Sequence, residues 1–174
     1  MQANTKKEAY SWMKAIVFAL VIVFICRAFI FTPVAVKGES MEPTLENKDK
    51  VVISKLSGSD RFDVIVFKEP VKDEQYIKRV IGLPGETVEM KDDVLYINGK
   101  PYEEPYLENN NITSDFTLKE LTGQEKVPDG CFFVLGDNRM NSKDSRELGF
   151  ISAESIIGEA KFRYYPLQEI VIPE

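Results

Sequence analysis

The hydrophobic pattern divides the chain into an apolar N-terminal segment and a longer part of mixed character. Residues 15–31 are apolar except for Arg27, and residues 11–13 extend this run toward the N-terminus. About 20 residues of α-helix reach roughly 30 Å, which matches the hydrocarbon core of a bilayer. The segment has no amphipathic face, and Pro33 prevents further regular helix. The sequence therefore predicts one N-terminal transmembrane helix, assigned to residues 9–31.

The charges around this segment predict its orientation. The first 14 residues contain three lysines and one glutamate, and positive charge tends to stay on the cytoplasmic side of a membrane. We therefore expect residues 1–8 to form a cytoplasmic tail and residues 32–174 to form an extracytoplasmic domain on the outer face of the plasma membrane. A cleavable signal peptide also has a basic start and an apolar middle. This alternative is disfavoured because no clean small-x-small site follows Phe31.

From residue 32 onward the pattern becomes that of short β-strands. Runs rich in β-branched and aromatic residues alternate with turn residues. The expected strands are residues 51–54, 62–67, 76–81, 87–90, 94–97, 131–135 and 156–165. Between them, Pro84-Gly85 fits the middle of a type II turn, and Asn98-Gly99 fits a type I′ hairpin.

One long segment interrupts the rhythm of strands and turns. Residues 102–127 are rich in acidic and amide side chains, and one helical turn is expected around residues 116–121. The remaining strands are short and joined by tight turns, as in hairpins. The expected fold class is therefore all-β, with antiparallel sheets packed as a sandwich or a partly closed barrel, preceded by the transmembrane helix.

Composition excludes several classes of function. The chain has 22 basic and 28 acidic residues, a net charge of −6, whereas a nucleic-acid-binding surface needs an excess of basic residues. It has no histidine and two cysteines. Cys26 lies in the apolar segment and Cys131 starts an expected strand, so a disulfide between them is not expected. With so few ligands, no metal site and no cofactor are expected either.

A serine follows closely after the apolar segment. Ser40 lies in the sequence GESMEPTL, residues 38–45. A serine hydroxyl is a weak nucleophile until a base removes its proton, and no histidine is present to act as that base. The alternative is an ordinary turn in which Pro43 fixes the backbone. Met41, beside the serine, would either contact lipid or belong to the core.

A lysine among apolar residues is the candidate base. Lys78 lies in the sequence YIKRVIGLPGE, residues 76–86. Free lysine is protonated at neutral pH because its pKa is near 10.4, but burial in apolar surroundings lowers this pKa by several units. On an extended strand, Tyr76, Lys78 and Val80 share one face. The alternative is a lysine on an edge strand that keeps its head in water.

A third segment combines many polar groups in one loop. The sequence GDNRMNSKDSR, residues 136–146, follows the apolar run 131–135. Such a density of polar groups costs stability unless the groups satisfy one another through ion pairs and hydrogen bonds. A solvated surface loop is the alternative interpretation.

These three segments, in this order after a single apolar span, resemble the bacterial type I signal peptidases. Those enzymes are membrane-anchored serine proteases that remove leader peptides from exported proteins. The resemblance extends from about residue 12 to residue 165, and the short chain with one span is similar to the compact Gram-positive members. It implies Ser40 as the nucleophile and Lys78 as the general base.

The resemblance also implies supporting roles for residues of the third segment. The matching positions are Ser142, which would orient the lysine by a hydrogen bond, Asp144 and Arg146, which would form an ion pair that braces the site, and Asp137 and Arg139, which would support the loop. The oxyanion hole of the family uses the backbone N–H of the nucleophile. In some members a hydroxyl two residues earlier adds a second donor, but here that position is Gly38, so a backbone N–H or a water would have to replace it.

The implied substrate is an extended signal peptide of a secretory preprotein, held beside the phospholipid membrane. It would pair its backbone with residues 34–38 and 75–77. The resemblance places shallow apolar pockets around Val34, Val36, Leu45, Tyr76 and Ile77. Pockets that admit alanine and exclude larger groups suit cleavage after a small-x-small motif.

Two other functions are compatible with parts of this pattern. An anchored β module could bind extended peptides without cutting them, although binding alone does not require a serine, a lysine and a second serine together. A self-cleaving repressor-type peptidase also uses a serine and a lysine. The membrane span and the lack of a DNA-binding domain argue against that second alternative.

Overall fold

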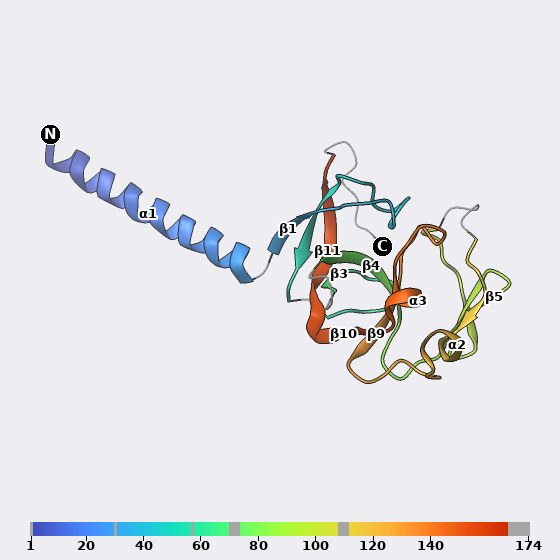
Figure 1. Cartoon of the computed structure of the whole chain (residues 1–174). Coiled ribbons are helices and arrows are strands. Elements are labelled where there is room, and N and C mark those ends of the chain that lie inside the picture. Colours follow the sequence, from blue (N-terminus) through green and yellow to red (C-terminus); the bar gives the residue numbers. More distant parts are fainter. Residues whose placement is uncertain (1, 30, 57, 70–73, 108–111, 167–174) are drawn as a thin grey trace.

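The fold consists of one long helix and a β domain (Figure 1). The computed structural model describes residues 2–29, 31–56, 58–69, 74–107 and 112–166, and within the first helix it describes the side chains of residues 8–24. Helix α1 (Gln2–Phe29) projects away from the β domain, and strand β1 begins two residues later. Phe31, which the prediction placed in the transmembrane segment, is therefore the first residue of a strand.

The predicted transmembrane helix was compared with the helices of the structure. No helix in the part of the chain searched, the described residues, is long and apolar enough to cross a membrane. The side chains of Cys26 and Arg27 lie outside the described residues, so the expected absence of a disulfide stays a prediction. Cys131 has a free, half-buried thiol.

Two antiparallel sheets make up the β domain. The seven-stranded sheet contains, in spatial order, β1 (Phe31–Ala35), β2 (Lys50–Ser54), β11 (Ile156–Tyr165), β3 (Val64–Lys68), β4 (Gln75–Gly82), β9 (Cys131–Leu135) and β10 (Ile151–Ser152). The four-stranded sheet contains β7 (Lys100–Tyr102), β6 (Val94–Ile97), β5 (Val88–Lys91) and β8 (Phe116–Thr117). Among the described residues neither sheet closes on itself, and the expectation of a mostly β domain with antiparallel sheets is confirmed.

The two sheets share a core where β4 and β9 meet the smaller sheet. Ile81 and Phe133 of the larger sheet pack in one buried cluster with Val88, Met90 and Leu95 of the smaller one. Three short helical segments complete the described chain, namely α2 (Leu118–Thr122), α3 (Ser145–Leu148) and η1 (Ala153–Ser155). Figure 1 shows α2 and β5 on the side of the domain away from α1.

The predicted turns are confirmed by their backbone geometry. Gly85 has φ +83°, and the N–H of Glu86 donates to the carbonyl of Leu83 at 3.2 Å, as in a type II turn. Asn98 and Gly99 have φ +52° and +73°, as in a type I′ hairpin. The helical turn expected at residues 116–121 is α2, which begins two residues later because Thr117 and Glu120 form a capping box.

One predicted strand begins later than expected. The prediction for residues 62–67 fails at its start, because Phe62 has φ +69° and β3 begins at Val64. The N–H of Phe62 donates to the carbonyl of Val80 at 2.8 Å, which holds this turn against β4. Strands β7, β8 and β10 and helix α3 were not predicted, because segments of two to four residues carry too little periodicity.

The loop that carries Ser40 is closed between β1 and β2. The N–H of Val36 donates to the carbonyl of Asp49 at 2.8 Å, and the N–H of Lys48 donates back to the carbonyl of Val36 at 3.0 Å. Strand β1 is an edge strand, which explains how it accommodates a proline. Met41 is 1% exposed and belongs to the core, which decides between its two predicted environments.

Candidate active site

The structure brings Ser40 and Lys78 into hydrogen-bond contact. Lys78 lies on β4, between β3 and the loop that follows β9, and is 2% exposed. Its Nζ donates to Ser40 Oγ at 2.5 Å and to the carbonyl of Ile77 at 2.8 Å. The alternative of a lysine that keeps its head in water is therefore wrong, because the side chain is buried and its Nζ is hydrogen-bonded within the protein.

Burial changes the acid–base properties of this lysine. Loss of solvent disfavours the ammonium and lowers the pKa of Lys78 from 10.5 to about 8. The carboxylates of Asp144 and Asp137 oppose this decrease, and the guanidinium of Arg146 adds to it. The Tyr76 ring, on the same face of β4, lies 5.8 Å from Nζ. A substantial fraction of Lys78 is therefore neutral near pH 8, and a neutral amine has a lone pair that can accept the hydroxyl proton.

A cleft of about 610 Å³ opens over the two side chains. Its walls include four of the five residues predicted to surround the substrate, namely Val34, Val36, Tyr76 and Ile77. The fifth, Leu45, does not line the cleft. It is 1% exposed and packs in the core below the serine loop with Val51 and Ile53. Glu74 and Lys143, which the sequence analysis did not single out, add charges to the lining.

Ser142 lies beside the pair but makes no hydrogen bond to it. Its Oγ is buried and makes no hydrogen bond to Lys78, so the bond that the resemblance implies is not formed in this structure. The hydroxyl instead helps to lower the pKa of Asp144. Ser142 packs against Gly136. A Cβ on Gly136 would collide with the Ser142 hydroxyl and would lie 2.5 Å from the carbonyl oxygen of Ser40. A glycine at this position is what permits the loop to approach the serine.

The ion pair expected between Asp144 and Arg146 is formed. Arg146 donates from Nε to Oδ1 at 2.9 Å and from Nη2 to Oδ2 at 2.8 Å. Asp144 also caps α3 and accepts the backbone N–H of Gly136 at 3.0 Å. Burial disfavours the carboxylate, but the Arg146 hydrogen bonds and charge outweigh burial and hold the pKa of Asp144 below its ordinary value. Asp144 therefore stays charged while it fixes the loop.

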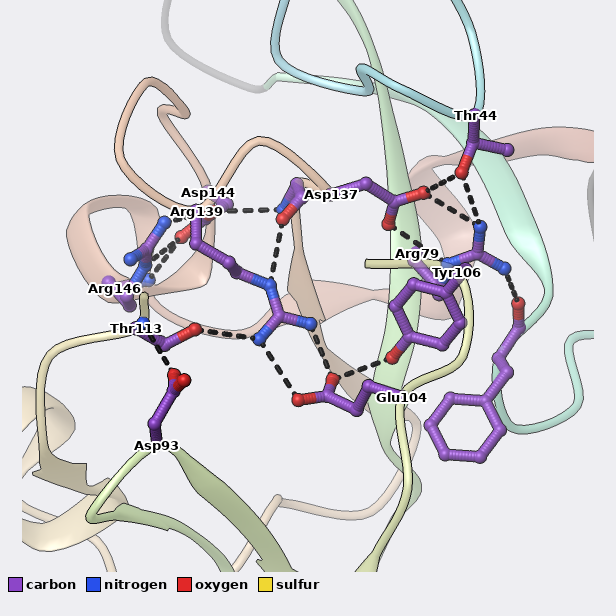
Figure 2. Close-up of polar contacts among 12 residues, drawn as sticks. Thr44, Arg79, Asp93, Glu104, Tyr106, Thr113, Asp137, Arg139, Asp144 and Arg146 are labelled. Atoms are coloured by element: carbon purple, nitrogen blue, oxygen red, sulfur yellow. Dashed lines mark hydrogen bonds and ion pairs between the residues drawn. The ribbon is translucent and has the colours of Figure 1, made fainter. Parts of the chain in front are cut away.

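Asp137 is held by an arginine that the sequence analysis did not single out. Arg79 donates from Nε to Oδ1 at 2.9 Å and from Nη2 to Oδ2 at 2.7 Å, and both side chains are 0% exposed (Figure 2). Thr44 Oγ1, on the serine loop, donates to Oδ2 at 2.5 Å. Arg79 also donates to the carbonyl of Phe62 at 2.8 Å. One guanidinium thus joins the lysine strand, the serine loop and the loop after β9.

The backbone conformation of Gly38 explains why this position has no side-chain donor for the oxyanion. Gly38 has φ +86°, a conformation that side chains with a Cβ rarely adopt. Its N–H donates to Asn47 Oδ1 at 3.3 Å. Replacing Gly38 with a hydroxyl-bearing residue would therefore strain the loop that carries Ser40.

Comparison with known proteins places this geometry in a family. The family model "Signal peptidase, peptidase S26" matches residues 9–165. The chain belongs to this family. It is 46% identical to signal peptidase I of Bacillus caldolyticus, over 97% of this chain and 96% of that protein. It is 43% identical to signal peptidase IB of Staphylococcus aureus, over 94% of this chain and 93% of that protein.

A solved structure supports the same assignment at the level of the fold. The crystal structure of a signal peptidase I from Enterococcus faecalis V583 matches with a TM-score of 0.55 and 46% sequence identity. The match covers 59% of this chain and 97% of that one. The sequence resemblance to signal peptidases is thereby confirmed, and the protein is a peptidase of the serine class.

Besides Glu74 and Lys143 of the cleft, three residues that support the site were missed, for different reasons. Arg79 interrupts an apolar strand, and a charged residue within such a run signals a buried ion pair, although its partner cannot be identified from sequence. Glu104 contacts Arg139 from a segment 35 residues away in the chain. Asn138 donates its backbone N–H to the carbonyl of Ser40 at 3.1 Å, a contact that has no side-chain signature.

The buried ion pair predicts a large effect on stability. We expect Asp137→Ala to lower the free energy of unfolding by about 3–5 kcal/mol, because it leaves Arg79 charged and buried without its partner. The double variant Arg79→Met/Asp137→Leu should recover a large part of this loss, since it removes both charges. Urea denaturation followed by circular dichroism measures both variants. A loss below 1 kcal/mol in Asp137→Ala would show that the pair does not hold the fold together.

Proposed function

We propose that this protein is a serine endopeptidase that removes signal peptides from secretory preproteins, with Ser40 as nucleophile and Lys78 as general base. The observation that carries the proposal is the 2.5 Å contact between Lys78 Nζ and Ser40 Oγ, made by a lysine that is 2% exposed. The printed names of the relatives, signal peptidase I and IB, support the choice of substrate.

In the proposed mechanism, Lys78 acts as a base and then as an acid. The neutral amine accepts the Ser40 proton while Oγ attacks the scissile carbonyl, and the backbone N–H of Ser40 stabilises the oxyanion. The ammonium then donates a proton to the departing amine, which leaves an acyl-enzyme. A water loses its proton to Lys78 and attacks the acyl carbon, and collapse of this second intermediate returns a proton to Oγ.

The proposed substrate site is the cleft between β1 and the start of β4. The ladder between β4 and β9 runs from Arg79 to Gly82 and so leaves Gln75–Ile77 outside it. Strand β1 is the outer strand of its sheet. An extended peptide could therefore pair with either edge. We propose that Val34, Val36, Tyr76 and Ile77 form the shallow pockets that select the small residues of a small-x-small motif.

We further propose that residues 9–29, the part of the predicted span that lies in α1, anchor the protein in the plasma membrane, with residues 1–8 cytoplasmic and the β domain on the outer face. Large apolar side chains are exposed all around the described part of α1, for example Trp12 (72%), Phe18 (67%) and Phe24 (71%). A helix that is apolar on every side needs an apolar surrounding to be stable.

Substitution of either proposed catalytic residue should abolish cleavage. We expect Ser40→Ala and Lys78→Ala each to reduce kcat/KM on a secretory precursor by at least about a thousandfold, since one removes the nucleophile and the other its base. Ser114→Ala and Lys91→Ala, at exposed positions, serve as matched controls and should retain full activity. Gel analysis of precursor and mature product gives the rates. Binding of intact precursor without cleavage by the wild-type protein would favour the peptide-binding module instead.

The pKa of Lys78 predicts the pH dependence of the reaction. The active form is the neutral amine, and below a pKa of about 8 the amine is increasingly protonated and cannot accept the Ser40 proton. We therefore expect kcat/KM to fall roughly tenfold per unit as the pH drops below about 8. A pH–rate profile from pH 6 to 10 measures this. A kcat/KM that still rises tenfold per unit up to pH 10, the ordinary range of lysine, would exclude Lys78 as a buried base.

The anchor proposal is tested by membrane extraction. We expect the full chain to remain in the membrane pellet after washing with alkaline carbonate, because a spanning helix is held by burial of its apolar surface in the bilayer. Added protease should digest the β domain of intact spheroplasts from outside. Release into the carbonate supernatant, or protection from external protease, would contradict the anchor or its orientation.

A further inference from the structure

The segment between β7 and β8 places two polar side chains against the loop that follows β9. Glu104 and Tyr106 lie between Arg139 on one side and Arg79 on the other (Figure 2). Arg139 donates from Nη2 to Glu104 Oε1 at 2.5 Å and from Nη1 to Oε2 at 3.3 Å. The Tyr106 hydroxyl donates to Oε1 at 2.6 Å. A segment outside the three site motifs thus contacts the arginines beneath the candidate dyad.

Arg139 in turn fixes the loop that touches Ser40. Its Nε donates to the carbonyl of Gly136 at 3.0 Å, and its backbone N–H donates to the carbonyl of Asp137, also at 3.0 Å. Within the same loop, the backbone N–H of Asn138 donates to the carbonyl of Ser40 at 3.1 Å. Movement of the Arg139 guanidinium would therefore shift a loop that is bonded directly to the nucleophile residue.

The charge of Arg139 depends on Glu104. The Arg139 side chain is 0% exposed and that of Glu104 is 8% exposed. Burial disfavours the charged guanidinium, but the hydrogen bond and charge of Glu104, together with Tyr106 and Asp137, outweigh burial and raise the pKa of Arg139. Asp137 already makes two hydrogen bonds to Arg79. Without Glu104, the buried charge on Arg139 would be drawn toward Asp137, and the ion pair with Arg79 would be disturbed.

Tyr106 connects the same carboxylate to the second arginine. Its ring centroid lies 3.9 Å from Cζ of Arg79, the residue that follows Lys78 on β4. Burial and the Glu104 charge raise the pKa of Tyr106, so the phenol remains a donor to Glu104. The ring covers one face of the guanidinium, an arrangement favoured by the cation–π interaction.

We propose that Glu104 and Tyr106 are positioning residues for the Ser40–Lys78 pair, acting through Arg139 and Arg79. The kinetic part of this inference rests on the proposed peptidase function. The charged groups that face Lys78 are Asp144 and Asp137, which raise its pKa, and Arg146, which lowers it. Displacement of Asp137 therefore changes the proton affinity of the base as well as the position of the loop.

The kinetic test uses Glu104→Gln with Glu103→Gln as the matched control. Glu103 is exposed and lies one position away, so both variants lose one negative charge. We expect Glu104→Gln to lower kcat about tenfold with KM within twofold, because it misplaces reacting groups and leaves the cleft intact. Its acidic limb should move by about half a pH unit to lower pH, since an Asp137 carboxylate shared with Arg139 raises the pKa of Lys78 less. The control should match the wild type.

The second arginine is tested with two substitutions of the tyrosine. Tyr106→Phe keeps the ring over Arg79 and should retain kcat within threefold of the wild type. Tyr106→Leu removes the ring and the hydroxyl and should lower kcat about tenfold. Equal kcat values for the phenylalanine and leucine variants would overturn the role of the ring.

A double variant separates positioning from stability. If Glu104 acts through Arg139, then Glu104→Gln/Arg139→Gln, which carries no unpaired buried charge, should have the same kcat as Arg139→Gln alone. A further tenfold loss in the double variant, an unmoved acidic limb in Glu104→Gln, or an equal shift in Glu103→Gln would each overturn the proposal.

A readout without cleavage distinguishes this inference from the proposed function. The pH at which Lys78 is half-reactive toward trace acetic anhydride, measured by mass spectrometry, reports its protonation directly. We expect the same half-unit decrease in Glu104→Gln relative to the wild type. Should the wild type fail to cleave precursors, the peptidase function fails, while this shift still supports the positioning role and its absence refutes it.

Discussion

The contact between a buried amine and a hydroxyl is the interaction on which the rest of this structure depends. Lys78 Nζ lies 2.5 Å from Ser40 Oγ, on a strand with neighbours on both sides and beneath a loop that excludes most solvent. Removal of solvent destabilises the charged ammonium more than the neutral amine and so lowers the pKa of Lys78. The same burial that would be costly for an ordinary lysine therefore gives this chain, which has no histidine, a base that is available near neutral pH.

Keeping these two groups together requires three segments that are distant in the sequence to meet. Ser40 comes from the loop between β1 and β2, Lys78 comes from β4, and the loop after β9 covers both. The buried guanidinium of Arg79, itself on β4, donates to Thr44 of the Ser40 loop and to Asp137 of the loop after β9. It also donates to the carbonyl of Phe62 in the turn before β3. The three arginines of the site each pair with a carboxylate, Arg79 with Asp137, Arg139 with Glu104 and Arg146 with Asp144, because a buried guanidinium without a partner would destabilise the fold. The ion pairs and hydrogen bonds that stabilise the loop after β9 therefore also hold Ser40 and Lys78 together.

Much of this arrangement could be predicted from the sequence, and the exceptions have physical reasons. Long β-rich runs and the Pro84-Gly85 and Asn98-Gly99 turns were predicted because their signals are local. The ion pair between Asp144 and Arg146 spans two residues and was implied by the resemblance. The partner of Arg139 was not predicted, because Glu104 reaches it only through the packing of the smaller sheet. Leu45 was placed in a substrate pocket, but its loop folds inward and turns it into the core.

The central claim is that burial lowers the pKa of Lys78 far enough for a substantial fraction of the amine to be neutral near pH 8. The most direct test is an NMR titration of the wild-type protein labelled with ¹³C at lysine Cε, with the Lys78 signal assigned by its absence in Lys78→Ala. The account predicts a pKa of about 8 for this signal, well below the ordinary value of 10.5 for lysine. A value at or above 10 would show that the amine is charged beside Ser40, and the proposed mechanism would then be wrong.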